Sequence, residues 1–134
     1  MTIAIYTDGA SRGNPGHASY GFSISDDKGK VLYEESKYIG IATNNFAEYS
    51  AVLNALVYVA KKFKKTLEVN FFMDSKLVAE QLSGRYKIKS PNLKSLIYKI
   101  QDLQRGIEEV TYTHISRELN KIADALANQA LDSR

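Results

Sequence analysis

The sequence contains no cysteine, which excludes disulfide bonds, a thiolate metal site and a cysteine nucleophile. Histidine is also scarce, with two residues that are not paired at ligand spacing, so the chain lacks the usual ligand set for zinc. The absence of cysteine suits a reducing compartment, and we therefore expect a cytoplasmic protein.

The sequence also lacks a long hydrophobic run near its start. The segment "MTIAIYTDG" has no basic residue, its apolar run is short, and Asp8 interrupts it, so it predicts neither export nor membrane insertion. With 44% hydrophobic residues and only two prolines in 134 residues, we expect a single globular domain over residues 1–134, without a membrane partner.

Positive charge is in slight excess, with a net charge of +3 and an isoelectric point near 9.0. This is a mild bias toward polyanionic partners. The basic residues gather in two clusters: Lys61, Lys62, Lys64 and Lys65, and then Arg85, Lys87, Lys89 and Lys94. Such clusters fit either a nucleic-acid-binding surface or solvated helix ends and loops.

Hydrophobic periodicity predicts strands in the first part of the chain and alternating helices and strands afterwards. Strands are expected over 3–7, 19–25, from residue 31, over 67–74 and over 110–115. Helices are expected from about Asn45, with Thr43 or Asn44 as N-cap, over 75–84, after Pro91 and from about Asn120. The last helix is expected to bury Ile122, Ala123, Leu126, Ala127 and Ala130. This order predicts an α/β (α+β) fold, in which helices pack on a mixed sheet.

Four carboxylates stand out against this pattern. Asp8 and Asp74 each end an apolar strand, and parallel neighbouring strands would bring both to one edge of the sheet. Glu48 is expected in the first turn of its helix, bordering the core, and Asp124 in the first turn of the last helix. Each of these two could instead support its helix through the macrodipole. Like charges at one edge are costly unless a cation lies between them, so the set favours an all-oxygen Mg²⁺ or Mn²⁺ site.

Four ordered segments resemble the signature motifs of the type 1 ribonuclease H family. They are "YTDGASRGNPG", "TNNFAEYSAVLNAL", "FFMDSKLV" and "HISRELNKIADALANQA", and together they span nearly the whole chain. The resemblance implies the ribonuclease H-like fold, a five-stranded mixed sheet ordered 3-2-1-4-5 and flanked by helices. It also implies that Asp8, Glu48, Asp74 and Asp124 form the family's acidic tetrad.

The resemblance further implies a substrate, a chemistry and a binding surface. The expected activity is endonucleolytic hydrolysis of the RNA strand of RNA/DNA hybrids by two Mg²⁺ or Mn²⁺ ions, giving 5′-phosphate and 3′-hydroxyl ends. Hybrid is the expected partner of a monomeric protein, with double-stranded RNA as a further candidate substrate. The substrate-binding residues implied by the mapping are Gly9, Ala10, Ser11, Asn14, Thr43, Asn44, Asn45, Ser75 and Lys76.

The sequence departs from many relatives in two ways. It is of a compact form, because "GRYKIKSPN" is only a short basic loop where some relatives have a basic protrusion, and we expect no separate hybrid-binding domain. The connection before the last helix is short and lacks the mobile histidine of many relatives. Arg117 is the expected substitute in catalysis, with His114 beside the cleft, although Arg117 could equally pair with Glu118 or face solvent.

Two other functions compete with this interpretation. One is a catalytically silent nucleic-acid-binding protein with the same fold, against which the intact tetrad argues. The other is a transposase or resolvase core acting on DNA, against which the "DGASRGNPG" segment argues, because such a segment suits recognition of 2′-hydroxyl groups.

Overall fold

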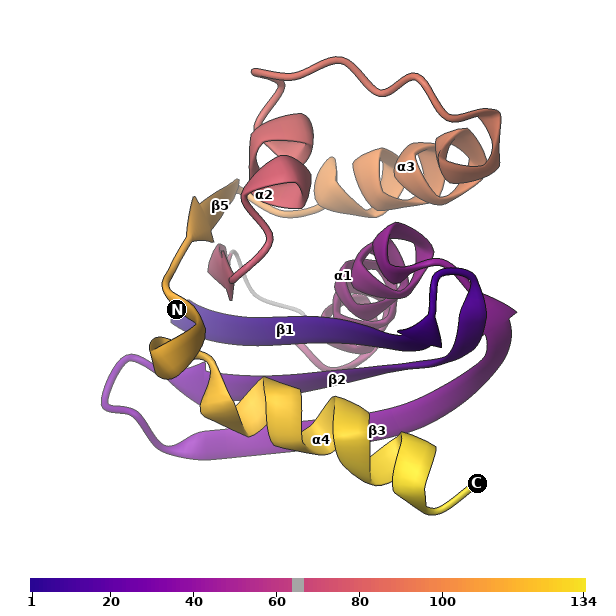
Figure 1. Cartoon of the computed structure of the whole chain (residues 1–134). Coiled ribbons are helices and arrows are strands. Elements are labelled where there is room, and N and C mark those ends of the chain that lie inside the picture. The colour runs from indigo at the N-terminus through magenta and orange to yellow at the C-terminus, as the bar shows by residue number, and fades with distance from the viewer. Residues whose placement is uncertain (64–66) are drawn as a thin grey trace.

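The computed structural model describes residues 1–63 and 67–134, which contain one mixed sheet of five strands (Figure 1). The strands are β1 (Thr2–Gly13), β2 (Gly16–Asp26), β3 (Val31–Ala42), β4 (Glu68–Met73) and β5 (Glu109–His114). Their order in the sheet is β3-β2-β1-β4-β5. β1 to β3 pair antiparallel, while β4 pairs parallel to both β1 and β5. The fold class and strand order predicted from the sequence are therefore confirmed.

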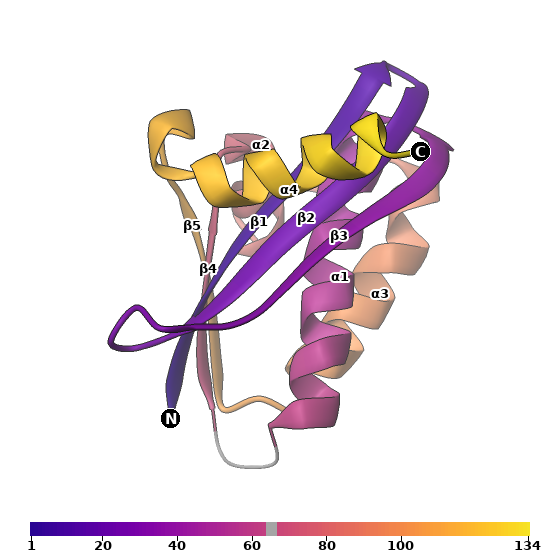
Figure 2. The same ribbon diagram turned by 90° about the horizontal axis from the view of Figure 1, so that it is seen from below.

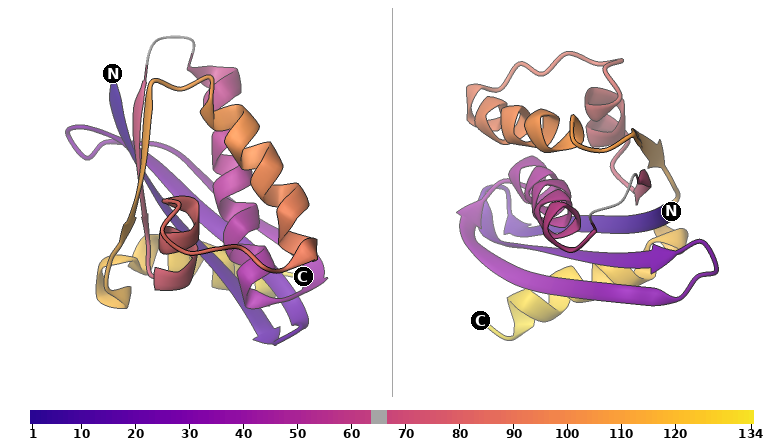
Figure 3. Two further views of the ribbon diagram at one scale, coloured as in Figure 1. Left: turned by 90° about the horizontal axis from the view of Figure 1, so that it is seen from above. Right: turned by 180° about the vertical axis from the view of Figure 1, so that it is seen from behind.

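Helices cover both faces of this sheet. They are α1 (Asn44–Lys62), α2 (Lys76–Leu82), α3 (Pro91–Gln104) and α4 (Lys121–Asp132), with a short 3-10 helix, η1 (Arg117–Leu119), before α4. α1, α2 and α3 lie on one face, and α4 crosses β1, β2 and β3 on the other (Figures 1 and 2). α3 packs beside α1, and the loop between α2 and α3 lies on the same side of the sheet as these helices (Figure 3).

Side-chain caps fix where the helices near the site begin. Thr43, and not Asn44, is the N-cap of α1, because its hydroxyl accepts a hydrogen bond from the backbone N–H of Phe46 at 3.2 Å. Ser75 caps α2 in the same way, accepting from Val78 at 3.3 Å. Both caps lie next to residues implied in substrate binding, so the start of each helix is fixed beside the expected site.

The hydrophobic core lies between the sheet and the α1–α3 face. Alternate residues of β1 and β2 point into it, as the period of a strand requires. They include Ile3, Ile5, Tyr20, Phe22 and Ile24, all buried. Burial of such side chains contributes about 1.5–3 kcal/mol each.

The first strand is longer than the sequence predicted. Instead of ending at Thr7, β1 continues to Gly13, and its partner residue Gly16 begins β2. The glycine-rich segment is thus part of a hairpin whose turn is Asn14–Pro15. Parallel pairing between β1 and β4 nevertheless stops at Tyr6 and Phe72. Beyond that point the two strands separate, and this opening in the sheet is the β1–β4 seam.

Two glycines allow helices to approach the sheet closely. A Cβ atom on Gly9 would lie 2.3 Å from the backbone nitrogen of Glu48, and one on Gly21 would lie 2.7 Å from the carbonyl oxygen of Ala123. Such distances are too short for any side chain. The sequence predicted Gly9 for substrate binding, and the packing of α1 on β1 is a second reason for a glycine at this position.

The inward face of α4 also differs from the prediction. Ala123, Ala127 and Leu131 are buried at a spacing of four residues, but Ile122 is 55% exposed. Ile122 precedes the buried stripe by one residue, which turns it about 100° around the helix and away from the sheet. Among the described residues, no helix is long and apolar enough to span a bilayer.

Candidate active site

Two strands place Asp8 and Asp74 at the β1–β4 seam. Asp8 lies two residues after the last β1–β4 pair, and Asp74 directly follows the last residue of β4. Because the strands run parallel, both side chains emerge at the same edge, as the sequence predicted. Asp8 lies in the middle of β1 and not at its end. Its carboxylate is accessible because β4 no longer pairs with β1 at this position.

Helices supply the other two carboxylates. Glu48 lies beyond the first turn of α1 and is 8% exposed, so it is more deeply buried than the predicted position at the border of the core. Ligand atoms of Asp8, Glu48 and Asp74 all lie within 4.8 Å of one another. Asp124, in the first turn of α4 as predicted, lines the same cleft of about 430 Å³. The structure therefore brings all four carboxylates together.

Burial and mutual repulsion favour the neutral form of three of these carboxyl groups, those of Asp8, Glu48 and Asp74. Burial, followed by the charge of Asp74, raises the pKa of Asp8 from its ordinary 3.8 to about 8. Burial and then the charges of Asp8 and Asp74 raise the pKa of Glu48. Burial likewise raises the pKa of Asp74, although the Asn120 side chain and Arg117 oppose the shift.

The cluster fits a divalent cation. The Glu48 Oε2 atom is buried and has no hydrogen-bond partner in the described structure, and none of the ion pairs found there involves any of the four carboxylates. A buried oxygen atom without a partner is costly unless something binds it. An all-carboxylate ligand set suits Mg²⁺ or Mn²⁺, so Asp8, Glu48, Asp74 and Asp124 are the residues that could hold such ions.

Of the two candidate catalytic residues before α4, the structure places Arg117 in the cleft. Arg117 lines it beside Asp74, whereas His114, the last residue of β5, lies near Glu80 of α2. Asn120 follows at the start of α4, and its side-chain amide donates to the Thr7 carbonyl at 2.9 Å. Asn120 therefore connects α4 to the β1–β4 seam, and sequence reasoning missed it.

The residues implied in substrate binding separate into three groups. Gly9, Ala10, Ser11 and Asn44 line the acidic cleft. Asn14, Thr43 and Asn45 line a neighbouring groove of about 720 Å³. The cleft and the groove are joined where the Asn14 side chain accepts a hydrogen bond from the backbone N–H of Asn44 at 3.1 Å.

Ser75 and Lys76 form the third group. Neither is among the residues that line the cleft or the groove in the described structure, and Ser75 serves as the cap of α2. They adjoin Asp74 in the chain, so the prediction that they border the substrate stays a prediction.

None of the described residues of the two basic clusters is among those that line the acidic cleft. Arg85 is paired with Glu80, while Lys87 and Lys89 are exposed in the loop between α2 and α3. Lys64 and Lys65 lie outside the described residues.

Comparisons with known proteins identify the family. Residues 6–130 match the family model described as Reverse transcriptase-like. A ribonuclease HI of Caulobacter vibrioides is 30% identical over 96% of this chain and 92% of that protein. The chain belongs to the type 1 ribonuclease H family. A bifunctional protein of Mycobacterium tuberculosis is 42% identical over 99% of this chain, and the ribonuclease HI of Halobacterium salinarum is 41% identical over 97% of it. The chain spans only 36% and 64% of the lengths of these two relatives.

Solved ribonuclease H structures share the whole fold. LC11-RNase H1, solved in complex with an RNA/DNA hybrid, has a TM-score of 0.94 and 43% identity, covering 98% of this chain and 97% of that one. RNase H1 of Halobacterium salinarum has a TM-score of 0.93 and 39% identity, with both chains covered completely.

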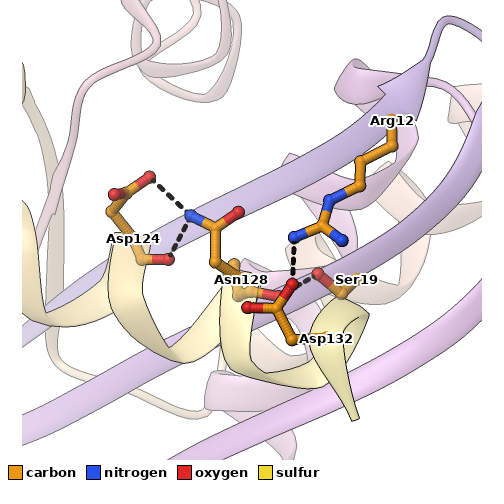
Figure 4. A network of polar contacts seen from close by, with 6 residues as sticks. Arg12, Ser19, Asp124, Asn128 and Asp132 are labelled. Carbon is orange, nitrogen blue, oxygen red and sulfur yellow. Dashed lines mark hydrogen bonds and ion pairs between the residues drawn. The ribbon is translucent and has the colours of Figure 1, made fainter. Parts of the chain in front are cut away.

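The cleft also has lining residues outside the predicted set. Arg12 and Asn128 line the same cleft as the carboxylates. The Asn128 amide donates to the Asp124 carbonyl at 3.0 Å and to its carboxylate at 3.4 Å (Figure 4). The four-residue spacing of Asp124 and Asn128 on a helix was the available signal. Arg12 offered a signal too, as a cation within the motif that follows Asp8.

Proposed function

We propose that this chain is an endonuclease that hydrolyses the RNA strand of RNA/DNA hybrids and leaves 5′-phosphate and 3′-hydroxyl ends. The observation that carries the proposal is the cluster of Asp8, Glu48 and Asp74 within 4.8 Å, with Asp124 in the same cleft. The hybrid-bound structure of LC11-RNase H1, a relative of the same fold, supports the choice of substrate.

The four carboxylates would hold two Mg²⁺ or Mn²⁺ ions. When bound, such ions activate a water molecule and neutralise charge at the scissile phosphate. The protein itself keeps Asp8 and Glu48 buried and holds Asp74 close to them. Because the pKa of Asp8 is raised, its carboxyl group must release a proton before it can act as a ligand.

Arg117 would act beside the leaving phosphate. It lines the cleft next to Asp74, and a guanidinium group binds phosphate oxygens with two parallel hydrogen bonds. A guanidinium group keeps its protons near neutral pH, so it cannot serve as a general acid or base there. We therefore assign it charge stabilisation and product release.

Close approach of backbone groups in the cleft to 2′-hydroxyl groups would distinguish RNA from DNA. Gly9 and Ala10 line the cleft with little side chain, which leaves their backbone groups accessible to 2′-hydroxyl groups. The adjoining groove, with Asn14 and Thr43, would take the DNA strand. Double-stranded RNA shares the 2′-hydroxyl groups and is the second substrate that we propose, for a protein acting as a monomer.

A cleavage panel tests this function directly. The purified protein is incubated with end-labelled hybrid, double-stranded RNA and double-stranded DNA, each with Mg²⁺, Mn²⁺ or a chelator. We expect cleavage of the RNA strand of the hybrid with either metal ion, none with the chelator and none of double-stranded DNA. Hybrid binding without cleavage under every condition would instead support the catalytically silent alternative.

A further inference from the structure

The acidic cleft is longer than the carboxylate cluster. It continues along α4 past Asp124 to Asn128 and Leu131 in the last turns of that helix. On the opposite side, Arg12 extends from the far end of β1 toward α4 (Figure 4). This distal part contains no carboxylate of the proposed metal site, and the proposed function gives it no role.

Arg12 forms an ion pair with Asp132, and another anion could replace this carboxylate. Its Nη2 atom donates to Asp132 Oδ1 at 2.5 Å, which connects the end of β1 to the last residue of α4. The side chains are 47% and 66% exposed. An ion pair this exposed contributes little stability, because water solvates both partners and salt screens them. Another anion can therefore replace Asp132 at small cost.

The two arginines of the cleft lie at opposite ends of α4. Arg117 precedes the helix, and Arg12 faces its last turn. With 12 residues, α4 is about 18 Å long, so the cations are separated by several nucleotides of an extended strand. The carboxylates line the same cleft as both arginines, so a strand that follows α4 from a scissile phosphate at the carboxylates comes within reach of Arg12.

We propose that Arg12 binds a backbone phosphate of the RNA strand, and that Asp132 competes with this phosphate for the Arg12 guanidinium. The proposal rests on the proposed function, because that function places the RNA strand in the cleft. Phosphate offers the same planar pair of acceptors as a carboxylate and carries at least as much charge. Asp132 thus keeps Arg12 pointing into the cleft in the free protein and gives it up when the substrate binds.

Equilibrium binding tests both halves of the proposal. Anisotropy of a fluorescent RNA/DNA hybrid is measured in metal-free buffer, where no cleavage occurs, over a range of salt concentrations. We expect Arg12→Ala to weaken binding about fivefold or more and to lower the slope of log Kd against log salt by about one. We expect Asp132→Asn to tighten binding about twofold to threefold, because it removes the competitor.

A second arginine–aspartate pair provides the matched controls. Arg105 and Asp102 form an exposed pair on α3, at 3.3 Å and with 77% and 78% exposed side chains, and neither lines the cleft. Arg105→Ala and Asp102→Asn change the net charge as the test variants do. We expect each to shift Kd less than twofold. Equal effects of Arg12→Ala and Arg105→Ala would overturn the proposal, since only net charge would then matter.

Replacing single RNA phosphates by an uncharged analogue locates the phosphate that Arg12 contacts. Hybrids with a single methylphosphonate at successive positions of the RNA strand are bound to wild-type protein and to Arg12→Ala. At the contacted position the two changes should be less than additive, because they remove the same interaction. Full additivity at every position would overturn the assignment to an RNA phosphate.

The outcomes separate this proposal from the proposed function. If the wild-type protein cleaves hybrid but Arg12→Ala binds it as tightly as wild type does, only the role of Arg12 is wrong. If Asp132→Asn fails to tighten binding while Arg12→Ala weakens it, the competition is wrong. If wild type binds hybrid but never cleaves it, the proposed function is wrong, and the binding results still decide the role of Arg12.

Discussion

The four carboxylates of the site are not equivalent, because their surroundings differ. Asp8 and Glu48 are buried at the β1–β4 seam, whereas Asp74 is only partly buried and lies beside Arg117 and Asn120. Asp124 lies across the cleft, where the Asn128 amide contacts its carboxylate. Asp74 can therefore be neutralised with the least disturbance of packing, which makes it the best position for testing the metal site.

Asp74→Asn should abolish cleavage without abolishing binding. The amide keeps the size of the side chain but loses an anionic metal ligand, so we expect the cleavage rate to fall about a thousandfold or more. Hybrid binding in metal-free buffer should be unchanged or tighter, since one charge that repels phosphate is gone. Single-turnover cleavage and anisotropy measure the two effects, with Asp102→Asn as the control. Turnover like that of wild type would refute the assigned metal ligands.

Arg117→Ala and His114→Ala should differ sharply. Arg117 lines the cleft and His114 does not, so we expect the arginine variant to lose about tenfold in kcat with little change in KM, and the histidine variant much less. Because Arg117 lowers the pKa of Asp74, its removal should also move the acidic limb of the pH profile to higher pH. Measurement of kcat from pH 5 to 9 tests both. A large loss of kcat in His114→Ala alone would return the role to the histidine.

At the residue scale, the sequence identified the carboxylates but not their supporting side chains. Asp8 and Asp74 could be predicted because each follows an apolar strand, a local signal. Asn120 could not, because its role depends on where the seam opens and on how α4 crosses the sheet. Those are long-range facts that no short segment contains.

At the scale of elements, the site exists because β4 leaves β1 while β2 stays paired with it. The sequence predicted the strand order but ended β1 too early, since glycines are poor strand formers. Pairing with β2 overrides that weak propensity as far as Gly13. The burial of Ile122 was mispredicted for a related reason, because the apolar stripe of α4 is narrow and its orientation is set by close contact at Gly21.

Gly9→Ala tests the close contact between β1 and α1. The added methyl group would lie 2.3 Å from the Glu48 nitrogen and 2.4 Å from the Ala47 carbonyl carbon, and backbone atoms cannot move aside cheaply. We expect a loss of about 3 kcal/mol in the free energy of unfolding, measured by urea denaturation.

Gly106→Ala is the control, because its Cβ would lie 3.5 Å from the nearest atom, the Leu103 carbonyl oxygen. We expect it to stay within about 0.5 kcal/mol of wild type. A neutral Gly9→Ala would mean that α1 packs less closely than the structure shows.

At the scale of the whole molecule, folding concentrates negative charge in a protein that is otherwise basic. The net charge is +3, yet four carboxylates converge on one cleft between the sheet, α1 and α4. The folded state therefore gains from anything that neutralises them, whether protons or metal ions. The free energy of unfolding should therefore depend on protonation and metal binding at these carboxylates, even without substrate.

The metal-free protein should lose stability as pH rises from about 4 to 8. The pKa of Asp8 is about 8 in the folded state against an ordinary 3.8, so the folded protein holds more protons than the unfolded chain between these values. The raised pKa values of Glu48 and Asp74 act in the same direction. We expect Tm to fall by about 5 °C or more between pH 5 and pH 8 in chelator. Mn²⁺ should reverse the fall at pH 8 and do little at pH 5, where a proton occupies Asp8. Asp8→Asn should flatten the metal-free profile and weaken the response to Mn²⁺, whereas Asp102→Asn should keep both. A metal-free Tm that is as high at pH 8 as at pH 5, in wild type and in Asp8→Asn alike, would show that the buried carboxylates do not couple to folding.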